Sequence, residues 1–161
     1  MMLAYLILGL VTLSRLAELP IASANTKRLI AAGGQEAAAG HYPAIVALHI
    51  FWLGALWWLA PGRPVSLPLL AAFGLIEVAR IWTLQTLGRR WTTRIIVVPG
   101  ETLVRRGPYR FVDHPNYVVV IAEIALLPLV FGLWPVTLVF SALNAAILTV
   151  RIRAENRALG R

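Results

Sequence analysis

The sequence predicts an all-α integral membrane protein with five transmembrane helices, and two observations lead to this prediction. Of the 161 residues, 59% are hydrophobic and the mean hydropathy is +0.75, whereas a soluble domain is only about half apolar. The apolar residues also form blocks close to the roughly 20 residues that a helix needs to cross a bilayer. We therefore expect one membrane-embedded domain over residues 1–161.

The first apolar block is Met1–Leu13, and its helical pattern continues to Glu18. Arg15 and Glu18 are three residues apart, so they can pair on one face of that helix. Pro20 is expected to kink or end it. A cleaved signal peptide with a cleavage site at 22–24 is the alternative, but no basic residue precedes the apolar run, which disfavours it.

The second and third helices are expected at Pro43–Ala60 and Val65–Leu87, joined by a tight turn over residues 61–64. The fourth is expected from Pro115 to about Val130. The fifth follows a turn at 131–135 and runs to about Val150, continuing as a polar helix over residues 151–159. Between the third and fourth helices, residues 94–104 hold two short β-prone runs around a Pro-Gly turn, which predicts a small hairpin.

Charge sets the expected orientation. The net charge is +8, but it is spread over the loops between apolar blocks, so it indicates membrane topology and not nucleic-acid binding. With the N-terminus outside, every basic residue except Arg63 and Arg80 falls inside or near the inner face. The third loop and the C-terminal tail then share the cytoplasmic face and can build one site. The chain has no cysteine and three scattered histidines, so no metal site is expected.

The most informative stretch is residues 107–117, a polar and ring-rich loop that runs directly into the fourth helix. Pro115 suits the first helical position, which places His114 near the N-cap, where free backbone N–H groups give a partial positive charge. His114 and Tyr117 can line one side of this terminus and suit a nucleotide-like ligand such as adenosine. An interfacial belt of rings at headgroup level is the alternative, and spacing alone does not separate the two.

Charged residues inside the apolar helices need partners. A carboxylate such as Glu123 costs at least about 2.5 kcal/mol at the bilayer centre, so it should face protein or a wet cavity. It either contacts substrate or braces the helices, with Arg80 or Asn144 as partner. Glu77 and Arg80 are spaced for a pair within the third helix. His49 is more often a hydrogen-bonded core residue than a ligand.

The polar tail carries an i, i+4, i+8 stripe of Arg151, Glu155 and Leu159. Glu155 can accept hydrogen bonds from ribose hydroxyls or pair with a cationic ligand group, and Arg153 can bind a carboxylate. A charge cluster that stops membrane transfer is the alternative; it explains the arginines but not Glu155.

The segments Gly107-Pro108-Tyr109-Arg110 and His114-Pro115-Asn116-Tyr117, followed by Arg153-Ala154-Glu155, resemble the isoprenylcysteine carboxyl methyltransferase family, especially its small bacterial members. The resemblance implies a site for S-adenosylmethionine on the cytoplasmic side, within about residues 88–161. Trp91 and Arg94 also resemble family positions. The implied cofactor contacts are Pro108, Tyr109, His114, Pro115, Asn116, Tyr117, Arg151 and Glu155.

Two residues depart from the family pattern. Asp113 stands where the family usually has Arg, and Asn156 stands where a second carboxylate usually follows Glu155. Both changes alter charge at the expected cofactor site.

The resemblance implies methyl transfer to an oxygen of a lipophilic acceptor dissolved in the membrane, a small lipid or a prenylated molecule, in a bacterial inner membrane. A carboxylate acceptor needs orientation, which Arg151 or Arg153 can supply. A hydroxyl acceptor needs a base, and His114 is the nearest candidate. The expected catalytic residues are His114, Arg153 and Glu155. The expected substrate contacts are Trp91, Arg94 and Glu123.

Two other functions stay open at this point. An NADPH-dependent membrane reductase resembling sterol reductases would use the arginine-rich loop for the 2′-phosphate, although such reductases have more helices. A non-catalytic membrane subunit would use the polar residues for packing alone.

Overall fold

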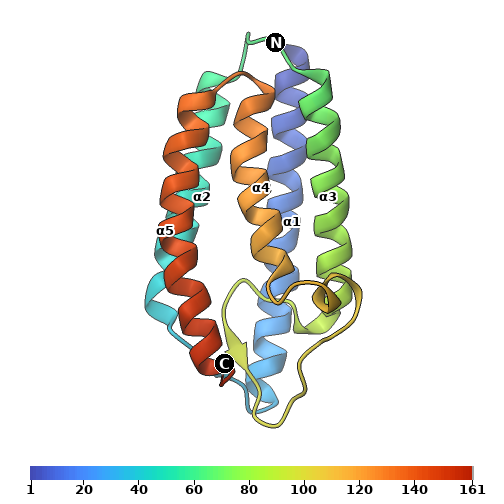
Figure 1. Cartoon of the computed structure of the whole chain (residues 1–161), viewed down its shortest axis with the longest axis vertical. Helices are drawn as coiled ribbons and strands as arrows, with labels where there is room; N and C mark the ends of the chain where they lie inside the picture. The colour runs from blue at the N-terminus through green and yellow to red at the C-terminus, as the bar shows by residue number, and fades with distance from the viewer. Residues whose placement is uncertain (161) are drawn as a thin grey trace.

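A computed structural model describes residues 1–160 and shows five helices side by side along the long axis of the molecule (Figure 1). They are α1 (Met2–Ala31), α2 (Tyr42–Leu59), α3 (Leu67–Leu87), α4 (Pro115–Val130) and α5 (Trp134–Ala158). Three short 3-10 turns accompany them: η1 (Ala39–His41), η2 (Gly88–Arg90) and η3 (Gly107–Arg110). The predicted all-α fold with five helices is confirmed, and the expectation that all five cross the membrane stays a prediction.

Four of these helices are long and apolar enough to cross a membrane. The exception is α4, whose 16 residues span about 24 Å, less than the roughly 30 Å of a bilayer core. It packs between α3 and α5. Large apolar side chains such as Trp58, Leu75 and Phe51 are exposed on the outer faces of the bundle, as a surface in contact with lipid requires. The chain is an integral membrane protein.

Helix α1 is longer than the sequence predicted, and the expectation that Pro20 ends it is wrong. The helix continues through Pro20 to Ala31. Its last turns are held from outside, because Asn25 donates to the carbonyl oxygen of Trp91 at 2.8 Å and Arg28 donates to that of Arg89 at 2.6 Å. Tertiary contacts thus stabilise a segment that local pattern assigned to a loop.

The predicted hairpin within residues 94–104 is also wrong. Strand β2 (Ile96–Val97) pairs antiparallel with β1 (Gln35–Glu36), from the loop between α1 and α2, and not with the residues after the Pro-Gly turn. Gly34 permits this close approach, because a Cβ there would lie 2.9 Å from Cγ2 of Ile96 in β2 and 2.7 Å from the carbonyl oxygen of Leu29 in α1. The third loop is therefore fastened to the first.

The interior changes character along the bundle axis. Near the N-terminus, α1, α2 and α4 enclose an apolar core whose most buried members are Leu8, Leu56, Ile124, Leu127 and Phe131. Charged residues follow at mid-bundle, and two cavities lie beyond them. We call the far end, built from residues 32–41, 88–114 and the last turns of α5, the loop end (Figure 1).

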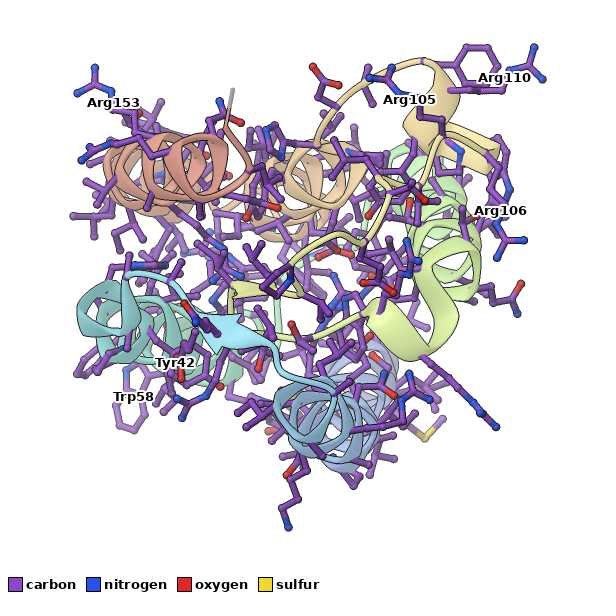
Figure 2. All side chains as sticks on the ribbon, turned by 90° about the horizontal axis from the view of Figure 1, so that it is seen from below. Tyr42, Trp58, Arg105, Arg106, Arg110 and Arg153 are labelled. Carbon is purple, nitrogen blue, oxygen red and sulfur yellow. The ribbon has the colours of Figure 1, made fainter. Side chains whose placement is uncertain are left out.

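The loop end brings the third loop and the C-terminal helix together, as the charge pattern predicted. Viewed from this end, Arg105, Arg106 and Arg110 project from one corner of the bundle (Figure 2). Arg63 lies at the opposite end, in the turn between α2 and α3. The side of the membrane that the loop end faces stays a prediction.

Candidate functional site

Two cavities lie at and above the loop end. The loop cavity, about 200 Å³ in volume, is enclosed by the third loop, the start of α4 and the end of α5. The bundle cavity, about 380 Å³ in volume, lies mainly among α1, α2, α4 and α5. The loop cavity is lined by six of the eight residues expected to contact a cofactor: Tyr109, His114, Asn116, Tyr117, Arg151 and Glu155.

The other two expected contacts, Pro108 and Pro115, are buried and lie outside the lining of both cavities, as far as residues 1–160 show. They shape the backbone instead. Pro108 lies in η3, whose first residue, Gly107, has a positive φ of 54°. A Cβ at Gly107 would come within 2.5 Å of the hydroxyl oxygen of Thr86. The Gly-Pro pair of the motif therefore lets the loop pass close to α3.

The stripe predicted on the tail is confirmed, since Arg151, Glu155 and Leu159 all line the loop cavity. Arg153 belongs to another face of α5. Its side chain is exposed and projects away from the bundle (Figure 2). The structure does not bring Arg153 to either cavity. Of the two arginines expected to orient a carboxylate acceptor, Arg151 lines the cavities and Arg153 does not.

A hydrogen-bonded network joins α4 to α5 at this cavity. The Nε atom of Arg151 donates to the Tyr117 hydroxyl at 2.8 Å, and that hydroxyl donates to the Glu155 carboxylate. A second guanidinium nitrogen of Arg151 donates to the carbonyl oxygen of Thr93 at 2.8 Å. Arg151 and Tyr117 are both buried, where charge-assisted hydrogen bonds are strong. The network fixes the guanidinium between the loop and both helices.

His114 occupies the N-cap of α4, as predicted. Its ring stacks on that of Tyr117, with centroids 5.2 Å apart and an angle of 21° between the planes. Its Nε2 atom lies 3.1 Å from Asn156 Oδ1, and its Nδ1 atom lies 3.6 Å from the Glu155 carboxylate. Asn156, which departs from the family pattern, thus holds the imidazole. With the amide oxygen as acceptor, Nε2 carries the proton of the neutral ring.

Tyr109 and Asp113 add polar groups to the loop cavity. Burial, and after it the nearby Glu155 carboxylate, raises the pKa of Tyr109 well above its ordinary value of 10.0. The phenol therefore stays neutral at physiological pH and keeps its proton for donation.

The bundle cavity is largely apolar and reaches the lipid-facing surface. Leu16 and Leu19 on α1 and Val46 and Ile50 on α2 line the cavity, and all four side chains are exposed on the outside of the bundle. These residues place the edge of the cavity at the lipid-facing surface between α1 and α2.

The two cavities share one wall, formed by Trp91, Thr92, Asn116, Tyr117 and Arg151, which line both. Two buried polar atoms in this wall, Trp91 Nε1 and Asn116 Oδ1, have no hydrogen-bond partner among the described residues. A buried unpaired donor or acceptor costs about 1–3 kcal/mol. One donor and one acceptor left unpaired at the same wall are the polar contacts that a ligand would complete.

The expected substrate contacts lie in three different settings. Trp91 is in the shared wall, and its backbone is held by Asn25. Arg94 lines the loop cavity, but its guanidinium is paired with Glu36 at 2.9 Å and stacks over the Tyr42 ring at 4.6 Å. The sequence missed Asn25 and Glu36 as supports of the site because their partners lie about 60 residues away.

Glu123 lies in a buried ion cluster at mid-bundle. The cluster joins α1, α3 and α4, and within residues 1–160 its carboxylate does not line either cavity. The predicted partner Arg80 is confirmed, at 3.1 Å. Arg80 also pairs with Glu18, while Arg15 pairs with Glu77 at 2.9 Å, Glu123 at 3.0 Å and Glu18 at 3.4 Å. The cluster members are Arg15, Glu18, Glu77, Arg80 and Glu123.

This cluster confirms the Arg15–Glu18 pair and corrects one expectation. Glu77 and Arg80 do not pair within α3, since each turns to residues of other helices. Three carboxylates sharing two guanidinium groups link the helices more widely than separate i, i+3 pairs would. The role of Glu123 as a helix brace is thereby supported.

The geometry defines a membrane-embedded helix bundle in which a cavity of the interior and a cavity of the loop end share one wall. The model of the isoprenylcysteine carboxyl methyltransferase (ICMT) family matches residues 69–161, which contain all the expected cofactor contacts. An uncharacterized protein, YpbQ, from Bacillus subtilis (strain 168) is 36% identical over 168 residues, covering 96% of this chain and 95% of that protein. No solved structure matches. The chain belongs to the ICMT family of membrane methyltransferases.

Proposed function

We propose that this protein transfers a methyl group from S-adenosylmethionine to an oxygen atom of a lipophilic acceptor that reaches the site from the membrane. The observation that supports this most is the shared wall. Trp91, Asn116, Tyr117 and Arg151 separate a polar cavity at the loop end from an apolar cavity open to lipid. A donor soluble in water and an acceptor soluble in lipid can meet there.

The residues of the loop cavity fit S-adenosylmethionine. The stacked rings of His114 and Tyr117 offer a flat surface for adenine. Oxygen Oε1 of Glu155 makes no hydrogen bond within the described part of the chain, so it can accept from ribose hydroxyls or from the ammonium group. The unpaired Trp91 Nε1 and Asn116 Oδ1 supply one further donor and one further acceptor.

Bound in this cavity, S-adenosylmethionine supplies a methyl group on a sulfonium, which an acceptor oxygen displaces in line. The protein mainly has to hold the two reacting atoms close and aligned, which contributes most to such a reaction. Arg151 faces both cavities, and the network with Tyr117 and Thr93 fixes its orientation. Its cationic group would orient the acceptor oxygen at the wall, the role first offered to Arg153 as well.

The kind of acceptor decides whether a base is needed. A carboxylate needs orientation alone. A hydroxyl must also lose a proton, and among the described titratable residues Tyr117 lines both cavities and already donates to Glu155. His114 stacks on the Tyr117 ring, lies 3.6 Å from the Glu155 carboxylate and lines only the loop cavity of the two. A proton from the acceptor would therefore pass through the Tyr117 hydroxyl to Glu155, beside which His114 lies.

The acceptor would come sideways from the bilayer through the opening between α1 and α2. Long apolar molecules leave the membrane at a cost of about 0.8 kcal/mol per CH₂ group, so an internal route avoids a large barrier. The loop end then faces the cytoplasm, where the cofactor is made, in agreement with the positive-inside rule. In a bacterial cell this membrane is the inner one.

The test is calorimetric binding to the protein purified in detergent, with S-adenosylhomocysteine and NADPH as separate ligands. We expect binding of S-adenosylhomocysteine and no binding of NADPH. Glu155→Gln should weaken it about tenfold or more, because a hydrogen bond to a charged group is worth about 1.5–3 kcal/mol. Glu101→Gln is the matched control, since Glu101 lines the same cavity but pairs with Arg90. Binding of NADPH alone, or of neither ligand, would overturn the proposal.

A further inference from the structure

The bundle cavity is largely apolar, yet some of the side chains that line it are polar. Asn144 on α5 is 3% exposed, and its amide makes no hydrogen bond to the described residues, yet it lines the cavity. Trp52 on α2 is 2% exposed, lines the same cavity, and leaves its Nε1 donor without a partner among these residues. A buried donor such as Trp52 Nε1 costs free energy while it lacks a partner, and the Asn144 amide lines the cavity, where it can bond to a ligand.

His49 lines the same cavity. Its Nδ1 atom is 2.8 Å from the carbonyl oxygen of Ile45, so Nδ1 donates and Nε2 is left as an acceptor. Its ring contacts that of Trp52 edge-on, with centroids 6.4 Å apart. Together with Asn144, these residues offer both donors and acceptors from two helices that pack against each other, α2 and α5. A hydroxyl group, which donates and accepts, matches such a set.

The charged residues on the opposite side do not explain these groups. Arg15, Glu18 and Arg80 also line the bundle cavity, but they bond to one another and to Glu123. Their hydrogen-bonding capacity is directed into the ion cluster. The unpaired capacity lies on α2 and α5, so a ligand with a polar group would bind on that side.

The position of Asn144 on α5 determines how far it lies from Arg151. It precedes Arg151 by seven residues on α5, which is two helical turns, so both residues lie on one face about 10 Å apart along the axis. Arg151 is in the wall where methyl transfer would occur. A polar group bound by Asn144 is therefore separated from the reacting oxygen by a stretch of apolar chain.

We infer that Asn144, Trp52 and His49 form a second recognition site in the bundle cavity, which binds a hydroxyl group on the hydrophobic part of the acceptor, about 10 Å from the methylated oxygen. The acceptor is then a lipid with an oxygen function along its chain, and not a plain hydrocarbon or isoprenoid tail. This inference rests on the acceptor cavity of the proposed function and adds what that cavity selects.

Three carboxylic acids of equal chain length test it by calorimetry in detergent: one unsubstituted, one hydroxylated at mid-chain and one hydroxylated beside the carboxylate. We expect the mid-chain hydroxy acid to bind about tenfold more tightly than the unsubstituted acid, the gain from one or two neutral hydrogen bonds. Without the site, a buried hydroxyl costs free energy and the order reverses. Equal or reversed affinities overturn the inference.

Two variants locate the effect. Asn144→Leu keeps the side-chain volume and Trp52→Phe keeps a ring, and each should reduce the ratio between the affinities for the mid-chain hydroxy acid and the unsubstituted acid. A preference that persists in both variants overturns the assignment. S-adenosylhomocysteine binding, measured on the same preparations, separates the two proposals. Intact cofactor binding without a hydroxyl preference contradicts this inference alone, and a preference without cofactor binding contradicts the proposed function alone.

Discussion

Arg151 donates from Nε to the hydroxyl of Tyr117 across 2.8 Å, and this bond, together with those of Tyr117 to Glu155 and of His114 to Asn156, joins the two parts of the chain that form the candidate site. Tyr117 comes from the start of α4 and Arg151 from the end of α5, and both residues line both cavities. A change at this pair should therefore affect cofactor and acceptor together.

Tyr117→Phe should destabilise the protein by about 1–3 kcal/mol, because it leaves the buried Nε of Arg151 without its acceptor. It should also weaken S-adenosylhomocysteine binding, since Glu155 loses the hydroxyl that positions it. Thermal unfolding and calorimetry in detergent measure the two effects. Tyr5→Phe is the control, because Tyr5 is 47% exposed on α1. Equal behaviour of the two variants would refute the role of the network.

Arg80→Ala should destabilise the protein by about 3–5 kcal/mol, because it removes one partner of a buried ionic network and leaves carboxylates uncompensated. Adding Glu123→Gln should restore part of the stability by neutralising one of those carboxylates. The midpoint of thermal unfolding in detergent measures both. Arg63→Ala, in the exposed turn between α2 and α3, should change little. If the double variant were less stable than Arg80→Ala alone, the cluster would not act as described.

The orientation can be tested directly because the chain has no cysteine. A single cysteine at Arg157 should be labelled by a membrane-impermeant maleimide only after the cytoplasmic face is opened, because the loop end is expected inside. A single cysteine at Arg63 should be labelled in intact cells. The reverse pattern would show that the loop end faces outward, and the route proposed for the cofactor would fail.

Tyr109→Phe should change how stability depends on pH at the alkaline end. Since the pKa of Tyr109 is raised in the folded protein above its ordinary value of 10.0, the neutral form is favoured on folding. Its contribution is complete below about pH 10 and decreases as the pH rises further. When the pH is raised from neutral to above about pH 10, the free energy of unfolding of the wild type should therefore decrease more than that of Tyr109→Phe. Parallel stability curves for the two proteins would contradict the raised pKa.

The sequence predicted those parts of the fold that depend on local pattern. Apolar blocks and flanking charges located the five helices, and Pro115 located the start of α4 with His114 at its N-cap. The stripe of Arg151 and Glu155 on α5 also followed from helical spacing. These features need no knowledge of distant residues, which is why composition and periodicity were sufficient.

What the sequence could not give depends on contacts between distant segments. The continuation of α1 past Pro20 relies on Asn25 binding the carbonyl oxygen of Trp91. Strand β2 pairs with β1 of the first loop, and the Arg94–Glu36 ion pair lies beside this pairing. Likewise, spacing offered Glu77 as the partner of Arg80, but tertiary packing brings Glu18 and Glu123 closer. Spacing along the sequence identifies possible partners, and tertiary packing determines which of them pair.

The two cavities meet at one wall but open in different directions. The loop cavity has exposed residues such as Arg105 at its rim, and the bundle cavity opens between α1 and α2 through Leu16 and Ile50. Each product of methyl transfer would leave by the path of its own substrate, and neither path crosses the other. One site can then be refilled while the other is still occupied. Steady-state kinetics should accordingly follow a random order of binding and release.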